Sequence, residues 1–134
     1  MTLKSQFESL KEKLINDKSI CKENRQLFKE FYDLEEYKLK RTNNLPKIDD
    51  NSYRTLLSYI SKLRNVNSWF KNKIWKNLTK EDIKKVYDDL EDNKLLTIKG
   101  TPFKDKEGYY TRVFKSKPFE LAGKADIARE VMEY

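Results

Sequence analysis

The apolar residues of this chain recur at three- and four-residue steps, which is the spacing of one face of an α-helix. The clearest example is the stretch 53–90, where two amphipathic segments are joined by a short, basic connection that contains tryptophan. We expect the apolar stripe of the first segment to be buried and its opposite side to be polar and basic. This stripe consists of Tyr53, Leu56, Leu57, Ile60, Leu63 and Phe70.

The second segment opens with a helix-start signal. Thr79 is a favoured N-cap residue, and Asp82 follows three positions later in the capping-box position. Leu78 and Ile83 flank this cap and are spaced to form a hydrophobic staple. We therefore predict a helix that begins just after Thr79. Its apolar face is expected to contain Ile83, Val86, Tyr87 and Leu90.

Residues 3–15 predict a short helix with a leucine-rich seam, with Ser5 and Glu8 available as a cap near its start. Two heptads are too few for an independent coiled coil, so the seam must pack on a neighbour. We expect that neighbour to be another helix of the same chain, and self-association is the alternative. The seam consists of Leu3, Phe7, Leu10 and Leu14.

The rest of the pattern predicts three further helices and two connections. Pro46 prevents a continuous helix across its linker, and Pro118 is expected to stop or kink the helix before it. Leu96 to Ile98 can form a short extended piece inside a loop around Gly100. The helices are expected over 20–41, from about 108 to 117 and over 121–134, with the linker at 42–52 and the loop at 95–106.

The composition supports the same fold class. The chain has 134 residues, three Gly and three Pro, and 38% of its residues are charged, which favours helices over strands and turns. Seven Phe, eight Tyr and two Trp supply enough aromatic area for a folded core despite a mean hydropathy of −0.93. The sequence therefore predicts an all-α protein.

The charge points to an anionic partner. The net charge is +7 and the pI is about 9.3. Residues 42–78 hold seven Lys and Arg against two Asp and Glu, a local charge of +5. Nucleic acid is the first expectation and an acidic membrane the second, while a merely solvated surface is the plain alternative.

Several kinds of chemistry are excluded by residue type. The chain has no histidine and one cysteine, so it lacks a Ser-His-Asp or Cys-His arrangement and a Cys/His zinc site. Its three scattered glycines form no phosphate-binding loop. Cys21 is read as a half-buried core residue rather than a nucleophile. We expect no enzyme activity, no metal and no cofactor.

A membrane location is not expected. No apolar run approaches the roughly 18 residues of a membrane-spanning helix. The N-terminus MTLKSQFESLKEK is amphipathic and contains acidic residues, unlike a signal peptide. Cytoplasmic residence is the expectation.

A basic and aromatic cluster remains as the candidate binding surface. Long cations on a helix can neutralise phosphates, and neighbouring Asn and Ser side chains can donate hydrogen bonds. Trp69 and Trp75 lie among the cations, but tryptophans in small helical domains are more often core residues than base-stacking surfaces. The cations on or just after the first central helix are Arg54, Lys62, Arg64, Lys71, Lys73 and Lys76, and Arg112, Lys115 and Lys117 follow later.

Four segments together resemble a known family. They are YRTLLSYISKLR, WFKNKIW, LTKEDIKKVYDDL and YYTRVFKSKPFELAGK. In this order they are similar to the N-terminal core-binding region of archaeal tyrosine recombinases, also called phage-type integrases. The resemblance covers about residues 20–134. The L-T-x-E-D-I start of the third segment is shared by many capped helices, so the combination is more specific than any one segment.

The resemblance implies a SAM-like bundle of four to five helices that closes on one side of duplex DNA, here with an N-terminal helical extension. It implies a DNA-binding core at 19–120 and a helix at 121–134 that leads toward a catalytic domain. Residues 1–18 fall outside the resemblance, and their apolar seam predicts an amphipathic packing or oligomerisation helix. The arginines, lysine, histidines or their substitutes, and nucleophilic tyrosine of that domain find no match here. Tyr134 is not expected to be the nucleophile.

The expected function is therefore the non-catalytic, DNA-binding part of a site-specific recombinase, either an excised fragment or a natural truncation. The nine cations named above are the expected DNA contacts. The alternatives are a helical protein-interaction module that self-associates through the seam of residues 3–14, and a stand-alone DNA-binding regulator.

Overall fold

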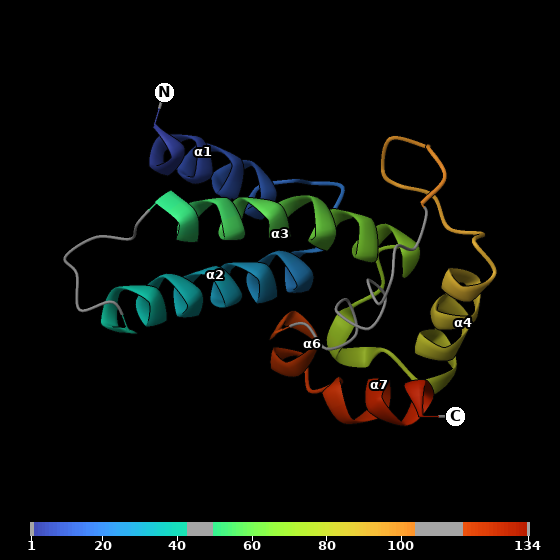
Figure 1. The fold of residues 1–134 in the computed structure, drawn as a ribbon. Coiled ribbons are helices and arrows are strands. Elements are labelled where there is room, and N and C mark those ends of the chain that lie inside the picture. The colour runs from blue at the N-terminus through green and yellow to red at the C-terminus, as the bar shows by residue number, and fades with distance from the viewer. Residues whose placement is uncertain (1, 43–49, 104–116, 134) are drawn as a thin grey trace. The chain divides into compact units, whose positions relative to one another are not determined.

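The computed structural model describes residues 2–42, 50–103 and 117–133 of the chain (Figure 1). Every regular element in these ranges is a helix, which confirms the all-α prediction. In chain order the elements are α1 (Leu3–Ile15), α2 (Lys22–Thr42), α3 (Asp50–Trp69), the 3-10 helix η1 (Trp75–Asn77), α4 (Lys80–Glu91), α6 (Lys117–Leu121) and α7 (Ala125–Met132).

The helices belong to two compact units, Met1–Leu63 and Arg64–Tyr134. The first unit contains α1, α2 and most of α3. The second contains the last turns of α3 together with η1, α4, α6 and α7.

An aromatic cluster forms the core of the first unit, where α1, α2 and the first part of α3 lie side by side (Figure 1). The Phe7 ring lies 5.4 Å from the Tyr32 ring and 5.7 Å from the Tyr53 ring, measured between centroids. The Tyr32 hydroxyl donates a 3.1 Å hydrogen bond to the Leu56 carbonyl, so its polar end is satisfied inside the core. Phe7 and Leu14 are fully buried. The α1 seam therefore packs within the chain at these two positions.

Polar contacts also join α1 to α2. The Lys11 ammonium lies 3.1 Å from the Asp33 carboxylate and 3.2 Å from the Glu36 carboxylate. Burial acts to raise the pKa of the Asp33 carboxyl, but hydrogen bonds from Lys11 and Lys29 outweigh it and lower the pKa. The start of α1 differs from the prediction, because Thr2 is the N-cap and its hydroxyl accepts from the Ser5 N–H at 3.1 Å.

The core of the second unit is built around Trp75, whose exposed fraction is 1%. Its ring lies 5.2 Å from the Phe119 ring and 6.4 Å from the Phe70 ring. Trp69 is also buried. Both tryptophans are thus core residues, as their setting in a small helical domain predicts.

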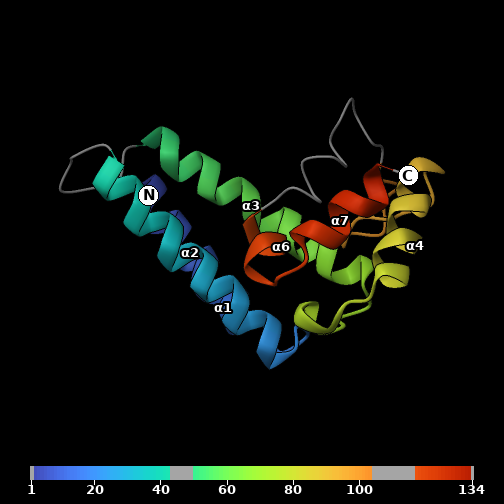
Figure 2. The ribbon, with the colours of Figure 1, turned by 90° about the horizontal axis from the view of Figure 1, so that it is seen from below.

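The predicted capping box of α4 is confirmed, because both of its hydrogen bonds are present. The Thr79 N–H donates to the Asp82 carboxylate at 3.0 Å, and the Asp82 N–H donates to the Thr79 hydroxyl at 3.2 Å. Leu78 and Ile83 are both buried. α4 contacts α7, and the two helices are neighbours that cross at an angle in Figure 2.

Several boundaries differ from those predicted, and α2 begins at Lys22 rather than at about Ile20. α3 begins at Asp50, before the predicted start at about Tyr53. Pro118 is the second residue of α6, a first-turn position where its missing N–H does no harm. The helix predicted over 121–134 is interrupted before α7 by Gly123, whose φ of 75° is left-handed. The helix predicted from about 108 lies outside the described residues.

Candidate nucleic-acid interface

The backbone after α3 is held in one shape by a helix-ending hydrogen-bond pair. The Lys71 N–H donates to the Ser68 carbonyl and the Asn72 N–H donates to the Asn67 carbonyl, both at 3.0 Å. This pattern is a Schellman motif, in which the first residue beyond the cap is left-handed and is usually glycine. Here that residue is Lys71, with a φ of 55°, and Asn72 follows with a φ of 60°.

A buried amide fastens the same connection from inside. Asn67 is only 4% exposed. Its Nδ2 donates to Asn72 Oδ1 at 3.2 Å, and its Oδ1 accepts from Trp75 Nε1 at 3.1 Å. A buried amide satisfied on both sides fixes its partners in place, because breaking either contact leaves an unpaired polar group. The segment that carries Lys71 and Lys73 is therefore positioned from both of its ends.

Residues 95–103 form a small hairpin, the 95–103 hairpin, drawn in orange in Figure 1. Leu96 and Pro102 make one antiparallel bridge. The Thr97 N–H donates to the Thr101 carbonyl at 2.8 Å, and the Gly100 N–H donates back to the Thr97 carbonyl at 2.9 Å. With Gly100 at a φ of 81°, this is the arrangement of a tight three-residue hairpin loop. Ile98 thus lies in the turn and not in an extended piece.

Two side chains from the last turns of α3 hold this hairpin. Trp69 Nε1 donates to the Leu96 carbonyl at 2.8 Å, and the Ile98 N–H donates to Asn65 Oδ1 at 3.0 Å. The Trp69 ring also contacts the Phe103 ring edge-to-face, with centroids 4.9 Å apart. Asn65 and Trp69 are four residues apart and so share one face of α3.

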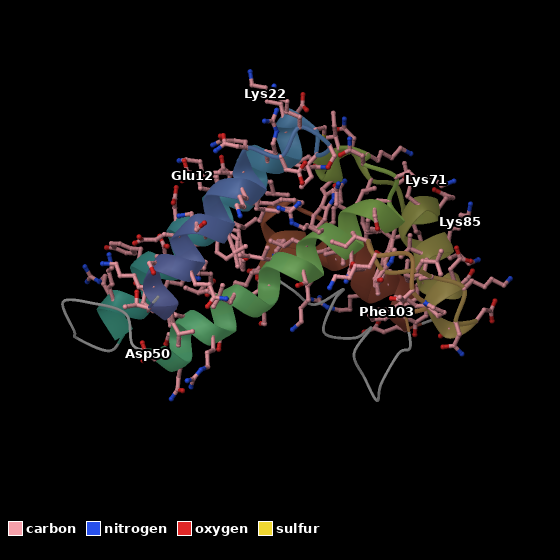
Figure 3. The ribbon with its side chains drawn as sticks, turned by 90° about the horizontal axis from the view of Figure 1, so that it is seen from above. Glu12, Lys22, Asp50, Lys71, Lys85 and Phe103 are labelled. Carbon is pink, nitrogen blue, oxygen red and sulfur yellow. The ribbon has the colours of Figure 1, made fainter. Side chains whose placement is uncertain are left out.

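A groove of about 760 Å³, the lysine groove, is lined by the end of α3, one face of α4 and the 95–103 hairpin. The α4 face has helical spacing, since its lining residues are Asp82, Lys85, Val86 and Asp89. Figure 3 labels Lys71 and Lys85, which both line the groove, together with Phe103 at the end of the hairpin. The lysines of the groove are Lys71, Lys73, Lys85 and Lys94.

The described lining of the groove carries four lysines and two aspartates, and one of the aspartates is neutralised locally. Lys73 Nζ lies 2.9 and 3.0 Å from the two Asp82 oxygens. The Thr79 backbone N–H, and after it Lys73, lower the pKa of the Asp82 carboxyl. Lys94 is 3.8 Å from Asp92 across an exposed surface, where an ion pair is weak. Lys71 and Lys85 form no ion pair with another residue that the structure describes.

The predicted DNA contacts do not all meet at one place. Lys71 and Lys73 line the groove, whereas Lys76 is exposed on η1 and is not among the described lining residues. Arg54 and Lys62 belong to the first unit. Arg54 donates to Asn51 Oδ1 at 3.1 Å, and the Lys62 ammonium lies 5.4 Å from the centre of the Tyr59 ring.

The remaining four predicted cations belong to the second unit, but none of them is among the described residues that line the groove. Arg64 and Lys117 are half-buried and are not among the described residues that line the groove. Arg112 and Lys115 lie outside the described residues.

Lys85 and Lys94 are groove residues that the sequence pattern did not identify. Both lie in or beside the acidic stretch from Glu81 to Asp92, so a charge count along the chain hides them. Helical spacing could have identified Lys85. It lies three residues after Asp82 and four before Asp89, so all three residues share the α4 face that lines the groove. Lys94 lies just beyond the C-cap of α4, and its N–H donates to the Asp89 carbonyl at 2.9 Å, so the turn that ends α4 places it at the groove.

Comparison with protein-family models, curated proteins and solved structures finds no match for this chain. Each helix in the described ranges is too short or too polar to cross a lipid bilayer. Within those same ranges, no group of three or more His, Cys, Asp or Glu side chains is arranged to hold a metal ion.

Proposed function

We propose that this chain is a DNA-binding domain that grips the sugar-phosphate backbone of duplex DNA in the lysine groove. The observation that carries the proposal is the convergence of four lysines from three separate parts of the second unit on one concave surface. Lysines placed in this way neutralise successive phosphates, which releases the counterions condensed on DNA and so drives binding.

The concave shape supports a nucleic-acid ligand over a merely solvated surface. A solvated lysine gains most when it stands apart from other cations, because like charges at close range repel. Lys71 and Lys73 are held by a left-handed backbone and a buried amide, an arrangement that is costly to build for lysines that only keep a protein soluble. An anionic ligand in the groove removes the repulsion between the lysines, and the fixed backbone holds Lys71 and Lys73 in place to bind it.

We further propose that the domain is the core-binding part of a tyrosine recombinase and contacts duplex DNA during integration and recombination. The support is the resemblance carried by WFKNKIW, LTKEDIKKVYDDL and YYTRVFKSKPFELAGK. The first two of these segments supply Lys71, Lys73 and Lys85 to the groove. Catalysis would belong to another domain, and the role of this one is to position DNA.

The test is a fluorescence anisotropy titration of a labelled duplex at low and moderate salt. We expect the wild-type protein to bind at low salt, with an affinity that falls steeply as salt rises. Replacing Lys71, Lys73, Lys85 and Lys94 with Gln should flatten the plot of log affinity against log salt, by up to about 0.9 for each phosphate that is no longer neutralised.

The matched control replaces four exposed lysines of the first unit with Gln, which changes the net charge by the same amount. It should leave the slope nearly unchanged. The proposal is wrong if the wild-type protein does not bind duplex DNA at low salt, or if the two quadruple variants lose affinity equally. The control lysines are Lys4, Lys13, Lys18 and Lys22.

A further inference from the structure

The 95–103 hairpin exposes two apolar side chains, one at its bridge and one in its turn. Among the described residues, three large apolar or aromatic side chains are exposed, namely Tyr37, Leu96 and Ile98. Two of them lie two residues apart on this hairpin, with Leu96 52% exposed and Ile98 51% exposed. Single exposed apolar residues are ordinary on protein surfaces, but two of them close together on one short hairpin require a physical reason.

The exposure is built into the fold. Trp69 and Asn65 bind the backbone of Leu96 and Ile98, at 2.8 and 3.0 Å. Because these bonds use main-chain groups, they hold the tip against α3 while leaving both apolar side chains partly in solvent. Gly100, left-handed at a φ of 81°, closes the turn beside Lys99.

The apolar pair and the cations face the same space. Leu96 and Ile98 line the lysine groove together with Lys94, and Lys99 lies exposed next to Ile98 in the turn. The partner of this surface must therefore offer negative charge and apolar surface within a few ångströms of each other. The minor groove of DNA does so, since its walls are deoxyribose rings and its edges are phosphates.

An acidic bilayer also combines charge with apolar surface, but it fits this site less well. A bilayer is flat on this scale, whereas the lysines lie in a concave groove of about 760 Å³ that suits a protruding phosphate backbone. Two apolar side chains also bury too little area for stable membrane anchoring. The charge and shape of the site both favour DNA.

We propose that the turn of the 95–103 hairpin enters the DNA minor groove, with Ile98 packed against the deoxyribose wall, while the lysine groove holds the adjoining phosphate backbone. This rests on the proposed function and adds a specific contact to it. The minor groove is about 6 Å wide, too narrow for the two-stranded hairpin but wide enough for the Ile98 side chain that projects from its turn. The apolar contact adds affinity without releasing counterions, so its contribution is independent of salt.

The test replaces Ile98 with Ser and repeats the duplex titration across a range of salt concentrations. We expect about tenfold weaker binding, as for the loss of one buried aliphatic side chain, with the slope against log salt unchanged. Tyr37→Ser in the first unit is the matched control, since it removes a similarly exposed large side chain, and it should bind like the wild type. Thermal unfolding of Ile98→Ser should match the wild type because the side chain is exposed.

A second arm uses an AT-rich duplex saturated with netropsin, which occupies the minor groove. Wild-type affinity should drop to the level of Ile98→Ser, and the variant should lose little more. The inference is overturned if netropsin has no effect, if Ile98→Ser binds like the wild type, or if the substitution instead abolishes binding to phosphatidylserine vesicles.

These outcomes separate the two proposals. If the wild-type protein binds and the lysine variants weaken it but Ile98→Ser does not, only the hairpin contact is wrong. If the wild-type protein fails to bind DNA at low salt, the proposed function is wrong and the hairpin contact falls with it.

Discussion

Lys71 stands at a left-handed backbone position that glycine usually fills at the end of a helix. A side chain there costs about 1–2 kcal/mol, because Cβ crowds the following carbonyl. The other two Schellman endings in the second unit, after α4 and α6, have Asn93 and Gly123 at the same position. Asn and Gly are the residues that tolerate this backbone best, so Lys71 is the exception among the three.

Replacing Lys71 with Gly should therefore stabilise the protein while weakening DNA binding. We expect a gain of about 0.5–1 kcal/mol in the free energy of unfolding, after the greater chain entropy of glycine is subtracted. Chemical denaturation measures the gain, and the duplex titration measures the loss of affinity.

Lys71→Ala is the matched control, since it removes the same charge but keeps Cβ. It should bind DNA as weakly as Lys71→Gly and show none of the gain in stability. If Lys71→Gly is no more stable than Lys71→Ala, the left-handed position is not strained. If both bind DNA like the wild type, Lys71 does not touch the DNA.

Asp82 combines a capping role with a pH-dependent charge. Its pKa is lowered from 3.8 by the Thr79 backbone N–H and by Lys73, so the ionised form is favoured in the folded state. The stability it contributes is therefore present above its ordinary pKa and is lost as the pH falls through the lower, folded pKa.

Asp82→Asn should destabilise the protein by about 1 kcal/mol at pH 7, in line with the loss of a good helix cap. The difference in unfolding free energy from the wild type should stay constant between about pH 5 and 7 and shrink below about pH 4. Urea denaturation at a series of pH values measures it. Glu81→Gln, one residue earlier and exposed, should show a much smaller difference. If the difference in unfolding free energy between Asp82→Asn and the wild type stays constant down to about pH 2, the ionised Asp82 carboxylate does not stabilise the fold.

At the scale of the element, substitutions in α1 test whether its apolar seam packs in the core or joins two copies of the chain. Phe7→Ala should cost about 3–5 kcal/mol, as for a buried aromatic residue whose neighbours Tyr32 and Tyr53 are left beside a cavity. Leu10→Ala, at a half-buried position of the same seam, should cost much less.

Sedimentation of both variants distinguishes the two roles. We expect the sedimentation coefficient of Leu10→Ala to match the wild type at all concentrations. If the substitution instead abolishes a concentration-dependent assembly, the seam is an oligomerisation surface and the alternative function gains support.

Helices were predictable wherever start signals and apolar spacing agree. Residues 3–15 form the predicted helix through their apolar spacing, although its cap is Thr2 and not Ser5. The helix after Thr79 is found with its predicted cap, because that signal lies within one turn of the chain. The 95–103 hairpin was not predictable in this way. It is held by Asn65 and Trp69, which precede it by 33 and 27 residues, through side-chain bonds to its backbone that no local pattern reveals.

At the scale of the whole molecule, composition predicted the all-α fold, which is confirmed, whereas the anionic partner suggested by the charge stays a prediction. Of the predicted cations that the structure describes, Lys71 and Lys73 line the lysine groove and the others do not. Along the sequence, the acidic residues of α4 offset the charges of Lys85 and Lys94. In the folded protein, most of those acidic residues are not among the described residues that line the groove. Summed charge along a chain therefore does not say which cations share a surface after folding.

The central claim is that duplex DNA covers the lysines of this groove, and differential lysine acetylation read by mass spectrometry tests it most directly. The protein is acetylated briefly with and without saturating duplex at low salt, and the modification of each lysine is compared. We expect strong protection of Lys71, Lys85 and Lys94, with less change at Lys73 because it is already paired with Asp82.

Four exposed lysines of the first unit provide the control within the same sample, and their acetylation should not change. These control lysines are Lys4, Lys13, Lys18 and Lys22. Equal protection of both sets, or protection of the control set alone, would contradict the account.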